Sequence, residues 1–375
     1  MDTTTTAFRL AHASGGGWSE MTEACLLQLG HLPDDTNLGF VYVTDSLDDE
    51  LPQITARLKE RTGIADWVGT IGFGVCVTGQ EYFDRPAIAV LVGAMPAGSF
   101  RVLPSVAKPG EALPDAVRAW VAEKHPMLGV VHADPRNGHV PAIVDSLSDD
   151  TECFLVGGLT ASRGKQTQLA GDPCEGGVSG VLFAGDVRVA TGLTQGCSPI
   201  GPIHEVTKSR DQVVMELDGK PAFEVFRSEI GEILARNLSR VGGYIHVALP
   251  IAGSDKADYL VRNLMGIDPQ NGWIAVGDRL KVGDKLMFVR RDGAAAMADL
   301  ERMVADVKKR ADVAPRAALY FSCVARGPNL FGRNSEELKA VQAAVGDVPL
   351  VGFYANGEIC NNRLYGYTGV LTLIM

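Results

Sequence analysis

The chain has 375 residues, a formal net charge of −10, and 46% hydrophobic against 21% charged residues, which is typical of a globular protein with a large core. The acidic balance and the lack of a dense lysine and arginine run argue against a protein that binds a nucleic-acid backbone. The N-terminus has no basic segment followed by an apolar one, and the apolar run at 87–100 is too short to span a bilayer, so we expect a cytoplasmic protein.

The cysteines indicate reduced thiols rather than a disulfide framework. There are seven of them, an odd number at wide spacings. No C-x-x-C pair occurs, so neither a structural zinc site nor covalently attached haem is indicated, and we expect no cofactor of these kinds.

Three segments of the chain show the same order of predicted elements. Each begins with an apolar strand, continues through a helix with one apolar face, and ends in two further strands. The first strands are 39–45, 127–134 and 317–325, and the helices after them are 51–63, 140–150 and 335–347. A strand, a helix and a second strand favour a right-handed crossover with a parallel pair, and the last strand is expected to pair antiparallel. We therefore predict an α/β fold with mixed sheets built from repeated β-α-β-β units.

Further helices are predicted between these segments, and one turn divides the chain. The additional helical patterns are 21–30, 114–125, 222–238 and 293–310. The turn at 217–223 contains a glycine and a proline that interrupt the pattern. We predict two domains, residues 1–218 and 219–375.

The first candidate site is the loop TQGCSPIGPIH at 194–204. Cys197 and His204 could form a nucleophile with its base, two metal ligands, or neither. Gly196 and Gly201 permit a close approach of the backbone, and the prolines between and after them stiffen the loop. We favour a rigid loop that lines a ligand pocket, and a cysteine-dependent acyl-transfer enzyme is the alternative.

Other candidates are polar residues that follow predicted strands, where ligands gather in α/β folds. Arg326 could clamp a carboxylate with both arms of its guanidinium, and Glu358 could bind an ammonium group. The remaining candidates of this kind are Arg262, Asn263, Asn329 and Asn356. Among the histidines, His132 and His246 lie in apolar strands, where a core role is expected, and a single histidine suffices to hold haem.

At these positions the chain resembles a known family. The run GVLFAGDVRVATGLTQGCSPIGP at 180–202 is similar to the N-terminal FIST domain. The motifs VRNLMGIDP, AVGD, FSCVARGPNLFG, GFYANGEI and GYTGVL resemble the C-terminal FIST domain and occur at 261–269, 275–278, 321–332, 352–359 and 366–371.

The resemblance implies a sensory protein of signal transduction rather than an enzyme. It implies a small ligand, such as an amino acid or a similar carboxylate metabolite, and a signal that passes to a separate partner protein. One branch with this architecture implies the alternative of a haem b protein that senses nitric oxide and regulates a histidine kinase, with His204 as a candidate ligand. No nucleic-acid or membrane partner is implied. Gly196, Cys197, Gly201, Arg262, Asn263, Arg326, Asn329, Asn356 and Glu358 are the expected ligand-binding residues.

Overall fold

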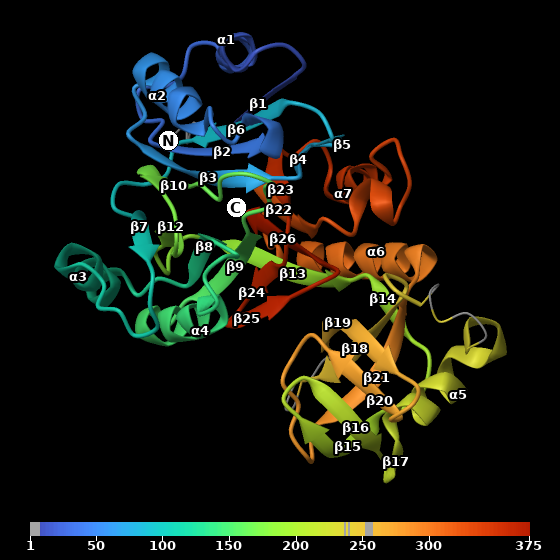
Figure 1. Ribbon diagram of the computed structural model, residues 1–375. Coiled ribbons are helices and arrows are strands. Elements are labelled where there is room, and N and C mark those ends of the chain that lie inside the picture. The colour runs from blue at the N-terminus through green and yellow to red at the C-terminus, as the bar shows by residue number, and fades with distance from the viewer. Residues whose placement is uncertain (1–7, 236–237, 239–240, 252–257) are drawn as a thin grey trace. The chain divides into compact units, whose positions relative to one another are not determined.

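The computed structural model describes residues 8–235, 238, 241–251 and 258–375, and these form two compact units (Figure 1). Residues 8–195 and 299–375 make up the first, here called the repeat unit, and residues 196–298 the second, here called the barrel unit. The repeat unit is therefore made of two segments of the chain, and the barrel unit is the segment between them. The boundary predicted after residue 218 falls inside the barrel unit, between two strands that pair with each other.

The repeat unit contains one pattern of elements three times: strand, helix, strand, helix, and then four strands. The first repeat comprises β1 (Arg9–Ser14), α1 (Trp18–Leu29), β2 (Leu38–Thr44), α2 (Leu51–Thr62), β3 (Asp66–Gly72), β4 (Gly74–Val77), β5 (Gln80–Phe83) and β6 (Ala87–Gly93). The second comprises β7 (Phe100–Val106), α3 (Asp115–Lys124), β8 (Leu128–Ala133), α4 (Val140–Thr151), β9 (Phe154–Leu159), β10 (Gln168–Ala170), β11 (Asp172–Cys174) and β12 (Val178–Phe183). The third comprises β13 (Val189–Gln195), α6 (Gly293–Arg310), β22 (Ala317–Cys323), α7 (Glu336–Val345), β23 (Leu350–Ala355), β24 (Glu358–Cys360), β25 (Arg363–Tyr365) and β26 (Thr368–Ile374).

The prediction of an α/β fold with mixed sheets and repeated β-α-β-β units is confirmed. In each repeat the two strands around the second helix are parallel, as in β2 and β3, and the last strand pairs antiparallel with the first of them. The repeat is longer than the predicted unit, because it begins one strand and one helix earlier and contains a two-stranded hairpin before its last strand. The barrel unit begins directly after the first strand of the third repeat, and its last residues, 293–298, are the start of that repeat's first helix.

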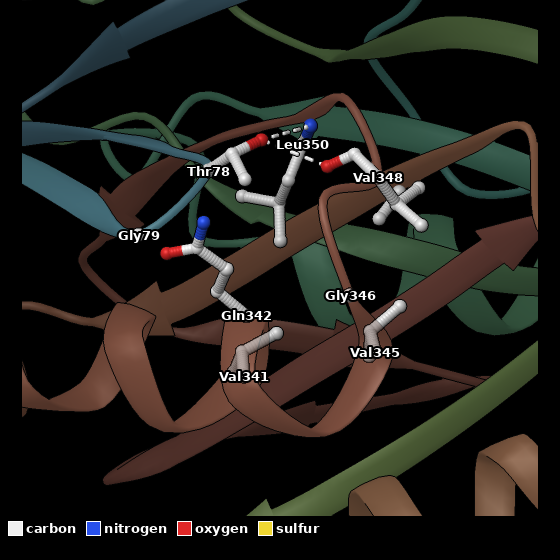
Figure 2. Close-up of a pocket in the computed structure, with 9 residues that line it drawn as sticks. Thr78, Gly79, Val341, Gln342, Val345, Gly346, Val348 and Leu350 are labelled. Atoms are coloured by element: carbon white, nitrogen blue, oxygen red, sulfur yellow. Dashed lines mark hydrogen bonds between the residues drawn. The ribbon is translucent and has the colours of Figure 1, made fainter.

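Each repeat gives its hairpin to the sheet of another repeat. The hairpin β4–β5 of the first repeat pairs with β23 of the third, β10–β11 of the second pairs with β3 of the first, and β24–β25 of the third pairs with β9 of the second. All three sheets therefore have six strands in the same order, and each is completed by another repeat. Figure 2 shows the turn of one exchanged hairpin, where Thr78 Oγ1 donates to the Val348 carbonyl at 2.8 Å and accepts from the Leu350 amide at 2.9 Å.

Equivalent glycines allow the parallel strands to approach each other. A Cβ atom on any of the three would lie 1.7 to 1.8 Å from a facing carbonyl oxygen, so only glycine fits. The glycines and the residues that carry these carbonyls are Gly69 with Val41, Gly157 with Val131, and Gly352 with Tyr320. The three glycines therefore occupy equivalent positions in the three repeats.

The repeats meet in a central cluster that joins their first parallel strands. The residues that follow the three carbonyls are Tyr42, His132 and Phe321, and their ring centroids lie 5.4, 6.2 and 6.3 Å apart. Three equivalent backbone hydrogen bonds close a ring between the repeats, from Ala161 to Ile71 at 3.0 Å, from Asn356 to Leu159 at 3.2 Å, and from Phe73 to Tyr354 at 3.3 Å. His132 is completely buried here, which confirms its expected core role, and burial lowers its pKa to about 3.

The barrel unit is an antiparallel sheet that closes on itself. Its strands are β14 (Cys197–Pro199), β15 (His204–Arg210), β16 (Val213–Leu217), β17 (Lys220–Pro221), β18 (Ile245–Pro250), β19 (Tyr259–Asp268), β20 (Trp273–Val276) and β21 (Lys285–Arg291). Closure runs through the order β21, β15, β16, β20, β19, β18 and back to β21, with β14 added on β21. The helix α5 (Ala222–Ala235) packs apolar residues such as Phe226 into the core and is interrupted at Gly231, whose φ is 75°. Predicted helical residues 236 and 237 lie outside the described part of the chain.

None of the helices in the part of the chain that the structure describes is long and apolar enough to cross a membrane.

Candidate functional site

The predicted site residues are divided between the two units. Arg326, Asn329, Asn356 and Glu358 belong to the repeat unit, whereas Gly196, Cys197, Gly201, Arg262 and Asn263 belong to the barrel unit. We describe the polar environment in each unit separately.

Arg326 is completely buried in the loop after β22 and is held by a carboxylate that sequence reasoning did not identify. Its Nε donates to Glu337 Oε1 at 2.8 Å, and the Gly327 amide donates to Glu337 Oε2 at 3.0 Å. The hydroxyls of Tyr320 and Ser322 donate to the same carboxylate at 2.7 and 3.1 Å. The guanidinium charge is therefore neutralised inside the protein, which a buried charge requires.

Glu358 is also completely buried, at the start of the exchanged strand β24. Its Oε2 accepts hydrogen bonds from the Thr368 amide at 3.1 Å and the Thr368 hydroxyl at 2.7 Å. Burial raises the pKa of its carboxyl to about 8, although Thr368 and the charge of Arg326 oppose the shift. Like Arg326, Glu358 has no surface open to solvent in this structure, so neither lines an open pocket.

The two asparagines of the repeat unit that were predicted as site residues make structural contacts. Asn329 donates from its side chain to the Val324 carbonyl at 2.9 Å, within its own loop. Asn356 uses its backbone amide in the ring of hydrogen bonds between the repeats.

The repeat unit also contains the pocket of Figure 2, which lies near the third-repeat helix α7. This pocket is apolar, and its volume of about 10 Å³ is too small for a metabolite.

In the barrel unit, Arg262 and Asn263 lie on β19. Arg262 Nε donates to Asp278 Oδ2 at 2.8 Å, and the Asn263 carbonyl accepts from the Gly277 amide at 2.9 Å. Cys197 is buried on β14, and its carbonyl accepts a hydrogen bond from the Tyr259 hydroxyl. The ring nitrogens of His204 face Asp218 and Glu229, so the structure gives no sign that His204 serves as a base for Cys197.

A hollow of about 390 Å³ lies beside the predicted loop in the barrel unit. This volume is within the range of small-molecule pockets. Its lining combines the loop, α5, the start of β18 and the end of β21, and consists of Pro199, Ile200, Glu229, Ile230, Tyr244, Ile245 and Arg290. Pro199 and Ile200 belong to the predicted loop, whereas its predicted ligand-binding residues Gly196, Cys197 and Gly201 are not among the lining residues.

Two opposite charges face this hollow. Arg290 is about half exposed, and its ion pair with Asp292 is long at 3.7 Å. Glu229 retains 21% exposure of its side chain. Gly201 makes room for this carboxylate, because a Cβ atom at residue 201 would lie 1.9 Å from Glu229 Oε2. The hollow thus offers a cation for a carboxylate and an anion for an ammonium group.

Sequence reasoning missed Glu229, Tyr244 and Arg290. Arg290 is the first charged residue after the buried apolar run LMFV of β21, and this change in polarity could have marked it as the residue where the strand reaches the surface. Nothing in the sequence relates Glu229 to Gly201, since the two meet only when α5 packs beside the loop.

The chain matches the models of two known domains. The model of the FIST N domain matches residues 37–220, and that of the FIST C domain matches residues 222–361. The chain belongs to the FIST family. FIST domains are sensory domains of signal-transduction proteins. The two matches meet close to the predicted boundary after residue 218, whereas the compact units divide at residues 195 and 298, so the boundary stays a prediction.

The relatives are uncharacterized proteins. One from Mycobacterium tuberculosis is 28% identical over 347 residues, covering 87% of this chain and 88% of the relative. Another, from Mycobacterium bovis, is 28% identical over 324 residues and covers 82% of each chain. A third, from Methanocaldococcus jannaschii, is 22% identical over 272 residues, covering 67% of this chain and 51% of the relative. The solved structure of PurLQS from Thermotoga maritima aligns with a TM-score of 0.24 and 10% identity over 98% of this chain and 72% of that chain, which carries no inference.

Proposed function

We propose that this FIST protein is a sensor whose barrel unit binds a small zwitterionic metabolite, such as an amino acid. The observation that carries the proposal is that Arg290 and Glu229, which carry opposite charges, line the same hollow. A guanidinium binds a carboxylate with two parallel hydrogen bonds, and a carboxylate binds an ammonium group. An α-amino acid carries both groups on adjacent atoms. Tyr244 and the partly exposed Ile200 add apolar surface for its side chain.

The test is binding of a panel of amino acids and of matched carboxylic acids that lack the amino group. A ligand that binds the native state raises the melting temperature by mass action, and calorimetry then gives its affinity. Arg290→Gln and Glu229→Gln should each weaken binding of the amino acid by about tenfold or more, because each removes a charged hydrogen-bond partner. Glu229→Gln should leave the affinity of the matched carboxylic acid nearly unchanged.

The matched controls are Arg279→Gln and Glu224→Gln, which remove the same charges from exposed positions of the barrel unit. Both should bind as the wild type does. The proposal fails when no amino acid binds the wild type, or when the two hollow variants bind as well as their controls.

We further propose that the occupied sensor acts in the cytoplasm on a separate partner protein, with a histidine kinase as the candidate. The sensory role of the FIST family supports this step. Co-purification of a candidate kinase with the protein should differ between ligand-free and ligand-saturated samples. Equal recovery in both samples would count against ligand-controlled signalling through that partner. The haem alternative with His204 as ligand stays a prediction.

A further inference from the structure

His204 lies directly beside Glu229, although it does not line the hollow itself. It begins β15, and its side chain is only 8% exposed. Its Nδ1 lies 2.6 Å from Asp218 Oδ2, and its Nε2 lies 3.8 Å from Glu229 Oε1. The ring also packs near Phe288 of β21, at 6.1 Å between centroids. The imidazole thus stands between two carboxylates on different elements.

The partner of Nδ1 fixes which nitrogen changes its proton. Asp218 accepts from the Glu205 amide at 2.9 Å as well as facing His204. The Glu205 amide first, and His204 second, hold the pKa of Asp218 below its usual range, so this carboxylate is ionised near neutral pH. An ionised Asp218 keeps a proton on Nδ1 in both charge states of the ring. The titrating atom is therefore Nε2, which points toward Glu229.

Nε2 is buried and makes no hydrogen bond within the described part of the chain. In a neutral ring this nitrogen is an acceptor, and at 3.8 Å it faces another acceptor, Glu229 Oε1. In a protonated ring it becomes a donor and draws the carboxylate toward itself. Gly201 restricts the other side of that carboxylate, because its backbone approaches Glu229 closely. The charge of His204 therefore decides how much of the Glu229 charge remains available to the hollow.

We propose that His204 is a positioning residue that makes binding in the hollow depend on pH. Protonated His204 competes with the ligand ammonium for Glu229, and neutral His204 releases it, so affinity rises with pH. Among the described residues, the ionisable groups that face the ring are Asp218 and Glu229, with Lys220 beside Asp218. The pH dependence of binding rests on the proposed function, whereas the coupling of His204 to Glu229 does not.

The coupling is tested without ligand. NMR spectra of the His204 ring are compared at about pH 5.5 and about pH 8 in the wild type, in Glu229→Gln and in the exposed-helix control Glu224→Gln. Glu229→Gln should change the His204 resonances more at the lower pH than at the higher, because only the protonated ring donates from Nε2 to the Glu229 carboxylate. The control should give the wild-type resonances at both pH values. His204 resonances that are the same in the wild type and Glu229→Gln at the lower pH overturn the inference.

The ligand arm compares affinities at about pH 5.5 and about pH 8, across the range in which histidine changes charge. The wild type should bind the amino acid identified above at least about fivefold more tightly at the higher pH, a typical coupling between two sites. His204→Gln, which cannot titrate, should show no such change, while the exposed control His31→Gln should retain it. A wild-type affinity independent of pH, or a slope that persists in His204→Gln, overturns the inference. Absence of binding at both pH values overturns the proposed function and the pH dependence with it, while the NMR comparison still decides the coupling.

Discussion

At the scale of single residues, Glu358 makes the stability of the protein depend on pH. Burial raises its pKa to about 8, far above the value in an unfolded chain. Between these two values the folded state binds the proton and the unfolded state does not, so the free energy of unfolding falls as pH rises. Above about pH 8 both states are ionised and the dependence ends.

Glu358→Gln should remove this part of the pH dependence. The amide oxygen can still accept from Thr368, and the side chain stays neutral at every pH. The free energy of unfolding of the wild type should fall by on the order of a few kcal/mol between about pH 5 and about pH 8, and that of the variant should fall clearly less. Some slope should remain, because burial also raises the pKa of Glu81 to about 7. Urea denaturation across this range measures the difference, with the exposed Glu301→Gln as control, and parallel curves for wild type and Glu358→Gln would contradict the prediction.

The partner of Arg326 shows why residue-level prediction ended where it did. The sequence placed Arg326 at the end of a strand, and the structure agrees. It did not identify Glu337, because Glu336 and Glu337 are equivalent in sequence as first-turn residues of a helix. Only the direction in which α7 faces the sheet distinguishes them, so that Glu337 is buried and Glu336 exposed.

At the scale of elements, the exchanged hairpins depend on a few anchoring hydrogen bonds. Thr78 joins the turn of β4–β5 to Val348 and Leu350 of the third repeat (Figure 2). Thr78→Val keeps the shape of the side chain but leaves these two backbone groups without their partner. It should destabilise the repeat unit by about 1–3 kcal/mol. Thr78→Ser keeps the hydroxyl and should lower the free energy of unfolding clearly less. Denaturation of both variants measures the difference, and a valine variant as stable as the wild type would refute the prediction.

The repeated elements were predictable, but the exchange of hairpins was not. Apolar periodicity marks β2, α2 and β3 and their counterparts, because these elements are long and bury one or both faces. The hairpin strands have only three or four residues, too few for a period. Consecutive strands usually pair nearby, and nothing in the short segment after β3 indicates that β4 pairs with β23.

At the scale of the whole molecule, the two compact units do not follow one another along the chain, because one of them is made of two separate segments. A linear reading divides the chain at a turn, and the predicted boundary lies at such a turn between β16 and β17. The repeat unit instead resumes after residue 298. The insertion could not be found from the predicted elements, because it begins directly after strand β13 and ends within helix α6, where no break in the helical pattern marks it.

This architecture predicts that the barrel unit can be removed. The Asp292 amide donates to the Gly196 carbonyl at 3.4 Å, and Asp299 accepts from Thr194 and the Gln195 amide at 3.0 and 2.7 Å, so the chain leaves and returns at one place. Replacing residues 197–291 with a short glycine and serine linker should leave a chain that unfolds cooperatively and no longer binds the ligand. A chain of residues 1–218 should not fold, because β13 would lack its partner β26 and the hairpin β4–β5 would lack β23. Circular dichroism during denaturation compares the two, and cooperative folding of 1–218 together with an unfolded linker variant would show that the third repeat does not complete the repeat unit.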